Sequence, residues 1–384
     1  MKICVFTGGR AEYGLLKPLL KLLAADNDIT LQILVAGMHL CPEFGSTYKI
    51  IEDDGFFIDE RVEMILSSDS PVSICKSMGL GLIGFSEALE RLQPDILVTL
   101  GDRFENFAVS SAAWTLRIPI AHIQGGEITA GAIDDGFRHC ITKLSSLHFT
   151  ATEEYRDRVI QLGEQPSCVF NVGAINVEAL KKTEILDKGI LEKELNFKIN
   201  RRTILVTFHP STLDKTRSDI YFKNVLDVID SDNSLRVIFT KTLADTDGRV
   251  INTMIDDYVA ANSDRCMASI SLGQLKYVSA LNYIGAVVGN SSSGIIETAS
   301  VPVATVNIGD REKGRICPTN VINSENSVEG ISDALKQALS PEFQSKVQAV
   351  VNPYEKEGTA RLIFNELSSF HIDHRSKEFF DLIA

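Results

Sequence analysis

The chain carries no recognisable signal for export or for membrane insertion. Met1 and Lys2 lead directly into a short apolar run, residues 3–7, which has neither the length nor the cleavage site of a signal peptide. No continuous apolar run approaches the ~20 residues that a membrane-spanning helix needs. We therefore expect a cytoplasmic protein without a membrane partner.

Paired cysteines and metal-ligand patterns are also lacking. The seven cysteines are an odd number, and no two of them form a C-x-x-C pair. His122, His139 and His148 do not have the spacing of metal ligands. We expect no metal, and reduced core cysteines in place of a disulfide framework. The cysteines are Cys4, Cys41, Cys75, Cys140, Cys168, Cys266 and Cys317.

Positive charge is scarce. The chain has 38 Lys and Arg against 51 Asp and Glu, which gives a formal net charge of −13. This balance argues against a nucleic-acid backbone as the main partner. An anionic ligand would have to be held locally, by helix N-termini and a few arginines.

The pattern of what is present predicts an α/β protein with two domains. The 384 residues exceed what one core usually holds, and short β-branched runs alternate with helical stripes in both halves of the chain. We therefore predict two doubly wound, Rossmann-like domains facing a central cleft. Residues 1–175 form the first domain and residues 176–365 the second, and a C-terminal helix at about 366–384 packs back on the first.

The stretch from residue 94 to residue 139 is the one around which the first domain is organised. Two short apolar runs, residues 96–100 and 118–123, read as buried parallel strands joined by a helix at about 105–116. The first run ends at Asp102 and Arg103, and the second ends at Gln124 and Glu127. Carboxyl ends of neighbouring parallel strands meet at one sheet edge, so we expect Asp102 and Glu127 to share a crevice. Several carboxylates with few cations suggest proton chemistry.

Two glycine-rich turns between a strand and a helix predict anion binding. Gly8, Gly9 and Arg10 follow the first strand, where the backbone can approach a phosphate or sugar closely. The turn at residues 289–294, Gly-Asn-Ser-Ser-Ser-Gly, offers hydroxyls and free backbone N–H groups suited to a diphosphate, and Glu297 could accept from ribose hydroxyls. Plain N-capping is the alternative for this turn.

Other charged residues lie near the second turn. Arg311 and Arg315 follow the next strand, where the alternative is a solvated charged loop, and two arginines in an acidic protein favour anion binding. His209 closes a strand and precedes a proline, so it is either a ligand-facing residue or a core histidine. The run Gly79-Leu-Gly81-Leu-Ile-Gly84 matches G-x-G-x-x-G, but it lies within a helical pattern and predicts close helix packing.

These residues together resemble a known family. The motifs are GGRAEYGLL near the N-terminus, LGDRFE, HIQGGE, IDDGFRHCITK, FHP, GNSSSGIIE and NIGDREKGR. They are similar, in order and over nearly the whole chain, to the UDP-N-acetylglucosamine 2-epimerases. The likeness is greatest to the hydrolysing branch that makes N-acetylmannosamine for bacterial sialic acid synthesis. It implies a GT-B type fold with UDP held mostly by the second domain, no cofactor, and a homodimer or homotetramer.

The resemblance also implies roles for individual residues. Asp102, the position of Gln124, and Asp134 match acid/base positions of the family. Where many relatives have a glutamate, this chain has Gln124, so either Glu127 takes that role or the remaining acids suffice; the neighbouring Asp135 is the alternative to Asp134. The expected catalytic residues are Asp102, Gln124, Glu127, Asp134 and His209. The expected substrate and UDP contacts are Arg10, Arg103, His209, Ser291, Ser292, Ser293, Gly294, Glu297, Arg311 and Arg315.

The expected reaction converts UDP-N-acetylglucosamine and water into N-acetylmannosamine and UDP, by elimination to 2-acetamidoglucal and hydration. The rival substrate within the family is N,N'-diacetylbacillosamine linked to UDP or GDP, on the route to legionaminic acid. The sequence is also compatible with a non-hydrolysing 2-epimerase, a glycosyltransferase or a non-enzymatic nucleotide-sugar sensor.

Overall fold

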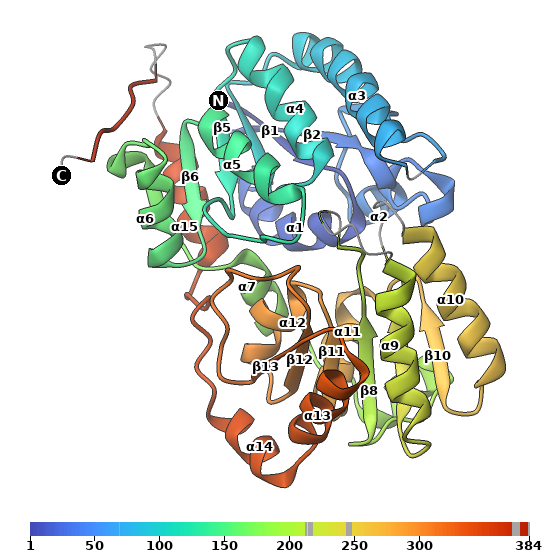
Figure 1. Ribbon diagram of the computed structural model, residues 1–384. Coiled ribbons are helices and arrows are strands. Elements are labelled where there is room, and N and C mark those ends of the chain that lie inside the picture. The colour runs from blue at the N-terminus through green and yellow to red at the C-terminus, as the bar shows by residue number, and fades with distance from the viewer. Residues whose placement is uncertain (69, 212, 214–217, 243–247, 371–376, 383–384) are drawn as a thin grey trace. The chain divides into compact units, whose positions relative to one another are not determined.

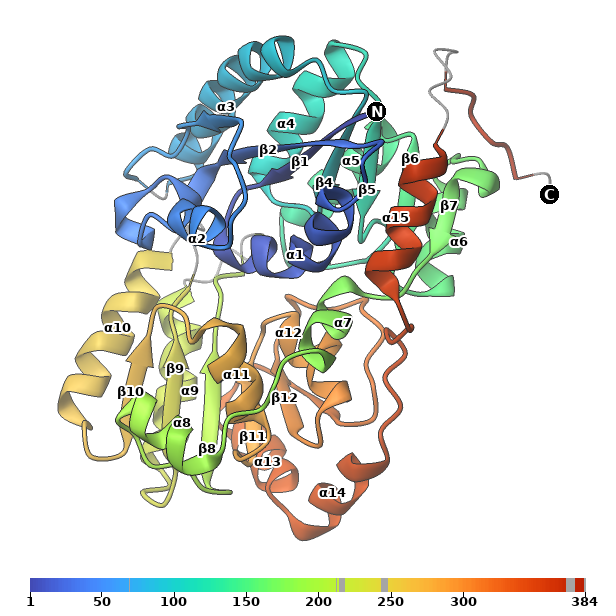
Figure 2. The ribbon, with the colours of Figure 1, turned by 180° about the vertical axis from the view of Figure 1, so that it is seen from behind.

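The computed structural model describes residues 1–68, 70–211, 213, 218–242, 248–370 and 377–382. The chain divides into two compact units (Figures 1 and 2). Unit 1 comprises Met1–Glu127, Asp134–Ala179 and Tyr354–Ala384, and unit 2 comprises Ile128–Ile133 and Leu180–Pro353. The predicted boundaries differ from this division at three places. Unit 1 continues to Ala179, whereas the predicted first domain ends at residue 175. The short segment Ile128–Ile133 belongs to unit 2, and the return to unit 1 begins at Tyr354.

Unit 1 is built on a sheet of seven strands in the order β3-β2-β1-β4-β5-β6-β7, all paired in parallel. The strands are β1 (Lys2–Thr7), β2 (Thr30–Ala36), β3 (Glu60–Val62), β4 (Ile96–Leu100), β5 (Ile120–Ile123), β6 (Leu147–Thr150) and β7 (Val169–Asn171). The helices are α1 (Arg10–Ala24), α2 (Tyr48–Asp53), α3 (Pro71–Leu92), α4 (Phe104–Thr115), α5 (Asp134–Leu144), α6 (Glu153–Gln161), α7 (Ile175–Lys181) and α15 (Thr359–Ser369).

Both faces of this sheet are covered because its strands are apolar on both sides. Ile3 and Val5 point to a core shared with α1 and α15, whereas Cys4 and Phe6 point to a core shared with α3 and α4. The two pairs of helices lie on opposite faces of the sheet (Figures 1 and 2). A parallel sheet buried on both faces is why the strands read as continuous apolar runs.

Unit 2 repeats the plan with six parallel strands in the order β10-β9-β8-β11-β12-β13. The strands are β8 (Thr203–Thr207), β9 (Arg236–Thr240), β10 (Cys266–Ser269), β11 (Ala286–Gly289), β12 (Ala304–Ile308) and β13 (Val321–Ser324). The helices are α8 (Lys188–Leu195), α9 (Ser218–Asp230), α10 (Gly248–Ala261), α11 (Gly273–Leu281), α12 (Ser293–Ile296), α13 (Val328–Ala338) and α14 (Pro341–Lys346). Residues of α9, α10 and α13 share a core with one face of the sheet, and residues of α8 and α11 share a core with the other.

The strand orders confirm the predicted α/β class with two doubly wound, Rossmann-like sheets. In each sheet the order reverses once, between β1 and β4 in unit 1 and between β8 and β11 in unit 2. Open parallel sheets bind ligands outside the carboxyl ends of the strands at such a switch point. The two reversals therefore indicate where a site is to be sought.

The glycines at positions 79, 81 and 84 lie inside α3, as the sequence predicts. A Cβ added at Gly81 would lie 2.7 Å from Cε of Met64, and one at Gly84 would lie 2.5 Å from Cγ1 of Val62. Gly81 and Gly84 thus serve close packing, whereas a Cβ at Gly79 would have no neighbour within 4 Å. Among the described residues, α3 is the helix that is long and apolar enough to cross a membrane by length and composition. Its side chains at Phe85 and Leu89 are fully buried in the core of unit 1.

The prediction of core cysteines is wrong for part of the set. All seven cysteines are free, but only Cys4 and Cys266 are buried, while Cys75, Cys140 and Cys317 are exposed. Cys75 lies on α3 and Cys140 on α5, and both helices keep a solvent-facing side. An apolar run in the sequence did not distinguish that side from the buried one.

Candidate active site

In unit 1 the switch point brings together the turn after β1 and the turn after β4. Glu12, a half-buried residue of α1, links the two turns. The backbone N–H of Gly8 donates to Oε2 of Glu12 at 2.5 Å, and the Asn106 side-chain amide donates to Oε1 at 2.8 Å. The same amide donates to the Leu100 carbonyl at 2.9 Å, at the end of β4. Burial is the main cause that raises the pKa of Glu12 to about 7, and the neighbouring Glu105 carboxylate adds to it.

Arg138, on α5, lies at the centre of a cluster of acidic residues beside the turn after β4. Its Nη2 donates to Asp102, directly after β4, and its Nη1 donates to Oδ1 of Asp135 at 3.2 Å. Nη1 also donates to the backbone carbonyl of Glu127 at 3.0 Å. The Arg138 side chain is only 2% exposed, so the guanidinium fixes these groups within a water-poor environment. His139, the next residue, lies 3.6 Å from Asp135.

The structure thus gathers Asp102, Asp135 and the Glu127 backbone at the carboxyl edge of the sheet. Glu127 is 3% exposed. Asp134 begins α5, and Asp135 is the residue that contacts Arg138. One buried guanidinium thus positions the carboxylates of both aspartates.

Gln124 is positioned by its backbone. It has a φ of +64°, and its N–H donates to the Phe149 carbonyl at 2.7 Å. Its side-chain amide donates to Oδ1 of Asn176 at 3.3 Å. Gly126, with a φ of +80°, follows in the same turn, and a Cβ there would lie 2.3 Å from the Tyr155 carbonyl oxygen. The turn therefore needs glycine, and it carries the chain from β5 to Glu127.

His122 supports this edge as a neutral residue. Its Nε2 lies 2.7 Å from the Gly101 carbonyl and its Nδ1 lies 3.2 Å from the Thr142 hydroxyl. Burial is the main cause that lowers the pKa of His122 to about 3. The imidazole bridges β5, the turn that holds Asp102, and α5.

The predicted cations of unit 1 lie at the starts of two helices. Arg10 is the first residue of α1 and is exposed. Arg103 precedes α4 and forms an ion pair with Glu105 at 3.2 Å. Both lie beside the turns of the switch point.

In unit 2 the switch point joins the ends of β8 and β11 by a reciprocal pair of hydrogen bonds. The His209 N–H donates to Oδ1 of Asn290 at 2.7 Å, and Nδ2 of Asn290 donates to the His209 carbonyl at 2.8 Å. Gly289 precedes this pair with a φ of +142°, and a Cβ there would lie 1.8 Å from the Thr207 carbonyl oxygen. The strands therefore approach so closely that only glycine fits.

The serine turn follows directly. Ser291 and Ser293 contact each other through their hydroxyls at 3.1 Å, and α12 begins at Ser293. This helix ends at Ile296, directly before Glu297. Burial and the neighbouring Glu297 carboxylate both raise the pKa of Tyr277, which places this tyrosine beside Glu297.

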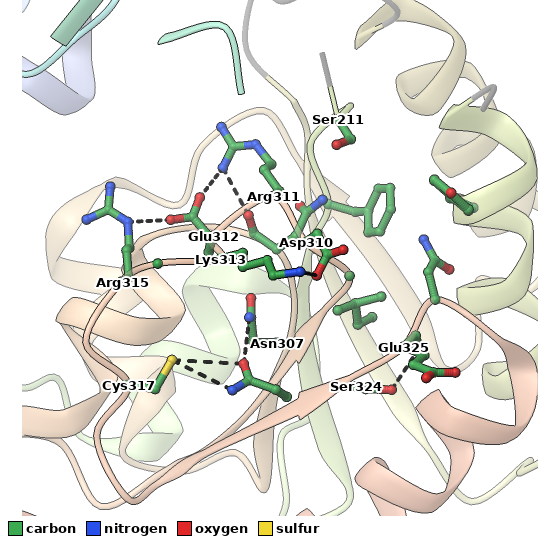
Figure 3. A pocket seen from close by; sticks show the side chains of 18 residues that line it. Ser211, Asn307, Asp310, Arg311, Glu312, Lys313, Arg315, Cys317, Ser324 and Glu325 are labelled. Atoms are coloured by element: carbon green, nitrogen blue, oxygen red, sulfur yellow. Dashed lines mark hydrogen bonds and ion pairs between the residues drawn. The ribbon is translucent and has the colours of Figure 1, made fainter. Parts of the chain in front are cut away.

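The loop after β12 holds the two predicted arginines around one carboxylate (Figure 3). Glu312, 2% exposed, pairs with Arg311 and also with Nε of Arg315 at 2.5 Å. Nη1 of Arg311 donates to the Asn290 carbonyl at 3.0 Å. Nε of Arg311 is buried and has no hydrogen-bond partner among the described residues. A donor of this kind beside the serine turn is suited to an anionic oxygen.

A pocket of about 680 Å³ lies over these strand ends in unit 2 (Figure 3). This volume falls in the range of small-molecule sites. The lining residues come from the last residues of β12 and β13, from the turns after β8, β11, β12 and β13, and from α9. They are Phe208, Ser211, Tyr221, Asn290, Asn307, Ile308, Gly309, Asp310, Arg311, Glu312, Lys313, Gly314, Arg315, Cys317, Asn323, Ser324, Glu325 and Asn326.

The segment Ile128–Ile133 packs on the loop that carries Arg311. The Ala130 N–H donates to the Lys313 carbonyl at 3.1 Å. A Cβ at Gly131 would lie 2.6 Å from Cα of Arg311. In the sequence this segment lies directly between Glu127 and Asp134, which are two of the expected catalytic acids.

Sequence reasoning located most of these residues but missed Glu12, Arg138 and Asn290 as functional candidates. Arg138 stands three residues after Asp135, a spacing that places both on one helix face. Asn290 belongs to the glycine-serine turn, and nothing local in the sequence indicates that its side chain ties β8 to β11.

The chain is similar to known proteins over most of its length. A family model described as UDP-N-acetylglucosamine 2-epimerase matches residues 21–368. The chain is 41% identical, over 89% of its length and 88% of the relative, to the GDP/UDP-N,N'-diacetylbacillosamine 2-epimerase (hydrolyzing) of Campylobacter jejuni. It is 34% identical, over 88% of its length and 89% of the relative, to the UDP-N,N'-diacetylbacillosamine 2-epimerase (hydrolyzing) of Legionella pneumophila.

Two further matches cover almost the whole chain. It is 36% identical, over 99% of its length and 97% of the relative, to the polysialic acid biosynthesis protein P7 of Escherichia coli. The crystal structure of UDP-GlcNAc 2-epimerase from Neisseria meningitidis bound to UDP-GlcNAc superposes with a TM-score of 0.80 at 19% identity, covering 96% of this chain and 100% of that one. The last likeness shows the fold.

Proposed function

Because the chain belongs to the UDP-N-acetylglucosamine 2-epimerase family and is a hydrolysing nucleotide-sugar 2-epimerase, we propose that its substrate is UDP-N,N'-diacetylbacillosamine. This sugar is 2,4-diacetamido-2,4,6-trideoxyglucose. The products are free UDP and the free 2-epimer. The observation that carries the choice of sugar is that the relatives at 41% and 34% identity are both named for it.

The residues of unit 1 supply the proton transfers. As the C1–O bond to the diphosphate breaks, positive charge grows on the ring and the C2 proton becomes acidic. Asp102, oriented by Arg138, accepts this proton, which leaves a 2-acetamido glycal. Water then adds its hydroxyl to C1, and a second acid returns a proton to C2 from the opposite face. Glu127 and Asp134 are the candidates for that acid, and the place of Gln124 in the turn explains why an acid is needed elsewhere.

The residues of unit 2 hold the leaving group. Arg311 donates to the diphosphate through its buried Nε, and the hydroxyls and N–H groups of the serine turn contact the same oxygens. Glu297 accepts from the ribose, and His209 lies on the switch-point side of the diphosphate. The remaining substrate contacts are Arg10, Arg103, Ser291, Ser292, Ser293, Gly294 and Arg315.

UDP-N-acetylglucosamine is the second candidate substrate. It is favoured by the 36% identical relative, whose name places it in polysialic acid biosynthesis and which matches 99% of this chain. In that case the product is N-acetylmannosamine.

Initial-rate kinetics with three substrates, together with identification of the products, distinguish these functions. Purified enzyme is incubated separately with UDP-diacetylbacillosamine, GDP-diacetylbacillosamine and UDP-N-acetylglucosamine, and free sugar and nucleotide are followed by NMR. We expect the highest kcat/KM with UDP-diacetylbacillosamine and release of the free 2-epimer. A higher kcat/KM with UDP-N-acetylglucosamine would move the assignment to the second candidate, and accumulation of a UDP-linked 2-epimer would contradict hydrolysis altogether.

We further propose that the enzyme works in the cytoplasm as a homodimer or homotetramer, as the sequence predicts. Light scattering on the eluting protein measures the mass directly. A monomer of 42.2 kDa at micromolar concentration would contradict this proposal.

A further inference from the structure

Two residues that line the pocket of unit 2 each carry a buried polar atom that has no hydrogen-bond partner among the described residues. One is the donor Nε of Arg311, and the other is the acceptor Oδ1 of Asn307. Asn307 is 4% exposed, and its Nδ2 donates to Oδ1 of Asn323 at 2.8 Å, so its carbonyl faces away from Asn323 (Figure 3). Neither atom has a hydrogen-bond partner among the described residues. Buried groups without partners are costly, and a ligand can supply both partners.

The charges around the pocket cancel. Its lining includes three cations and three anions, so the pocket as a whole suits a neutral group with one anionic oxygen at Arg311. The six are Arg311, Lys313, Arg315, Asp310, Glu312 and Glu325.

The uncharged part of the lining combines amides with apolar surface. Asn307, Asn323 and Asn326 provide amide groups, and Phe208 and Ile308 provide carbon surface. An acetamido group has the same mixed character, because it carries one N–H donor, one carbonyl acceptor and one methyl group. The lining therefore matches amide chemistry better than a purely hydroxylated sugar.

The nucleoside belongs on the other side of the diphosphate. Glu297 and the three serines of the turn do not appear among the described residues that line the pocket, whereas Arg311 does. If Glu297 binds the ribose and Arg311 the diphosphate, the part of the substrate that reaches Asn307 is the sugar.

We propose that this pocket binds the 4-acetamido edge of the diacetamido sugar, and that Oδ1 of Asn307 accepts from the 4-acetamido N–H. This inference rests on the proposed function and deepens it, because it names the residues that select the substrate. The acetyl methyl and the C6 methyl lie against Phe208 and Ile308. A hydroxyl at C4 can rotate to another acceptor, whereas the amide N–H has one direction, so the diacetamido substrate depends more strongly on Asn307.

The first test compares two substrates in two variants. Asn307→Leu removes the acceptor at similar volume, and Asn323→Ala removes the exposed side chain that orients Asn307. We expect each to lower the ratio of kcat/KM for UDP-diacetylbacillosamine to kcat/KM for UDP-N-acetylglucosamine at least about tenfold. An unchanged ratio in both variants would overturn the proposal. Asn323→Ala covers the case in which Asn307→Leu does not fold.

Asn320→Leu is the matched control. Asn320 is fully buried in the same unit, has an equally unsatisfied Oδ1, and does not line the pocket. We expect it to lower the melting temperature and to leave the substrate ratio unchanged. A ratio change as large as that of Asn307→Leu would show that loss of any buried amide has this effect, which would contradict a specific role for Asn307.

The second test uses a thiol in the pocket and needs no turnover. Cys317 lines the pocket and is exposed, with its Sγ 3.8 Å from Nδ2 of Asn323. In the Asp102→Asn variant, UDP-diacetylbacillosamine should slow alkylation of Cys317 by iodoacetamide at least about fivefold, whereas UDP alone should not. Cys75, exposed on α3, is the internal control in the same peptide map.

The outcomes separate the two claims. If the wild-type enzyme does not hydrolyse UDP-diacetylbacillosamine, the proposed function fails. If it does, but the substrate ratio is unchanged and Cys317 is not protected, the function stands and the pocket assignment fails.

Discussion

The two candidate sites have the same scaffold and opposite charge. In unit 1 one buried arginine, Arg138, pairs with two carboxylates, Asp102 after β4 and Asp135 on α5. In unit 2 one buried carboxylate, Glu312, pairs with two arginines. Both arrangements lie at the carboxyl edge of a doubly wound sheet. The comparison teaches that the fold provides the position, and the few residues after each strand decide the chemistry. Unit 1 is equipped to move protons, and unit 2 is equipped to hold an anion.

The largest expected effect is on kcat and comes from the carboxylates of unit 1. Asp102→Asn keeps the shape of the side chain and removes the proton acceptor, so kcat should fall at least ~10²-fold. The Kd for UDP should change little, because UDP is held by unit 2. Steady-state kinetics and calorimetry with UDP measure the two quantities. Full activity of Asp102→Asn would contradict the assignment of catalytic roles to residues 94–139.

The next effect identifies the second acid. Glu127→Gln should lower kcat by about 10²-fold if Glu127 replaces the acid that is missing at Gln124. Asp134→Asn is the parallel variant in the same assay. Wild-type turnover in Glu127→Gln together with loss of turnover in Asp134→Asn would show that Asp102 and Asp134 are the working pair.

A smaller effect, on the affinity for UDP, is expected from the arginines of unit 2. Arg311→Ala removes a charge-assisted contact with the diphosphate, so the Kd for UDP should rise about tenfold. Lys313→Ala is the matched control, since Lys313 is on the same loop and its ammonium pairs with the exposed Asp310 at 3.5 Å. Equal losses of affinity in the two variants would indicate general electrostatics and not a specific contact.

The smallest effect concerns the half-buried Glu12 and depends on pH. Its pKa is raised from 4.5 to about 7 in the folded state, so between these values the unfolded chain binds fewer protons than the folded one. Stability should therefore fall as pH rises through this window, by the contribution of Glu12. Glu12→Gln cannot lose such a proton. The melting temperature of this variant minus that of the wild type should therefore increase as the pH rises from 5 to 8. A difference that is constant over this range would contradict a raised pKa.

The sequence predicted which residues follow the strands at the carboxyl edge of each sheet. This was possible because strands buried on both faces are continuous apolar runs, which are easily recognised. Apolar β-branched runs ended at Asp102, Glu127 and His209, and the structure places these residues at the strand ends. Short strands at the margins carry less of this signal. β3 spans Glu60–Val62 and contains two charged residues, so only its pairing with β2 shows it to be a strand.

The partners inside the sites could not be predicted in the same way. Arg138 is an ordinary charged residue in a helix by its sequence. It is buried against the carboxylates of Asp102 and Asp135 and the backbone carbonyl of Glu127. Glu12 likewise depends on the Gly8 N–H and on Asn106, which is distant in sequence. Such roles arise from tertiary neighbours and have no local pattern.

The central claim is that the sugar loses its C2 proton before water is added. The most direct test is to run the reaction in D₂O and examine the free sugar product by NMR. The account predicts that C2 of the released 2-epimer carries deuterium in essentially every molecule, because the proton taken by Asp102 exchanges with solvent and the returning proton comes from solvent-equilibrated acids. Retention of the original hydrogen at C2 in the released sugar would contradict elimination and hydration at this site.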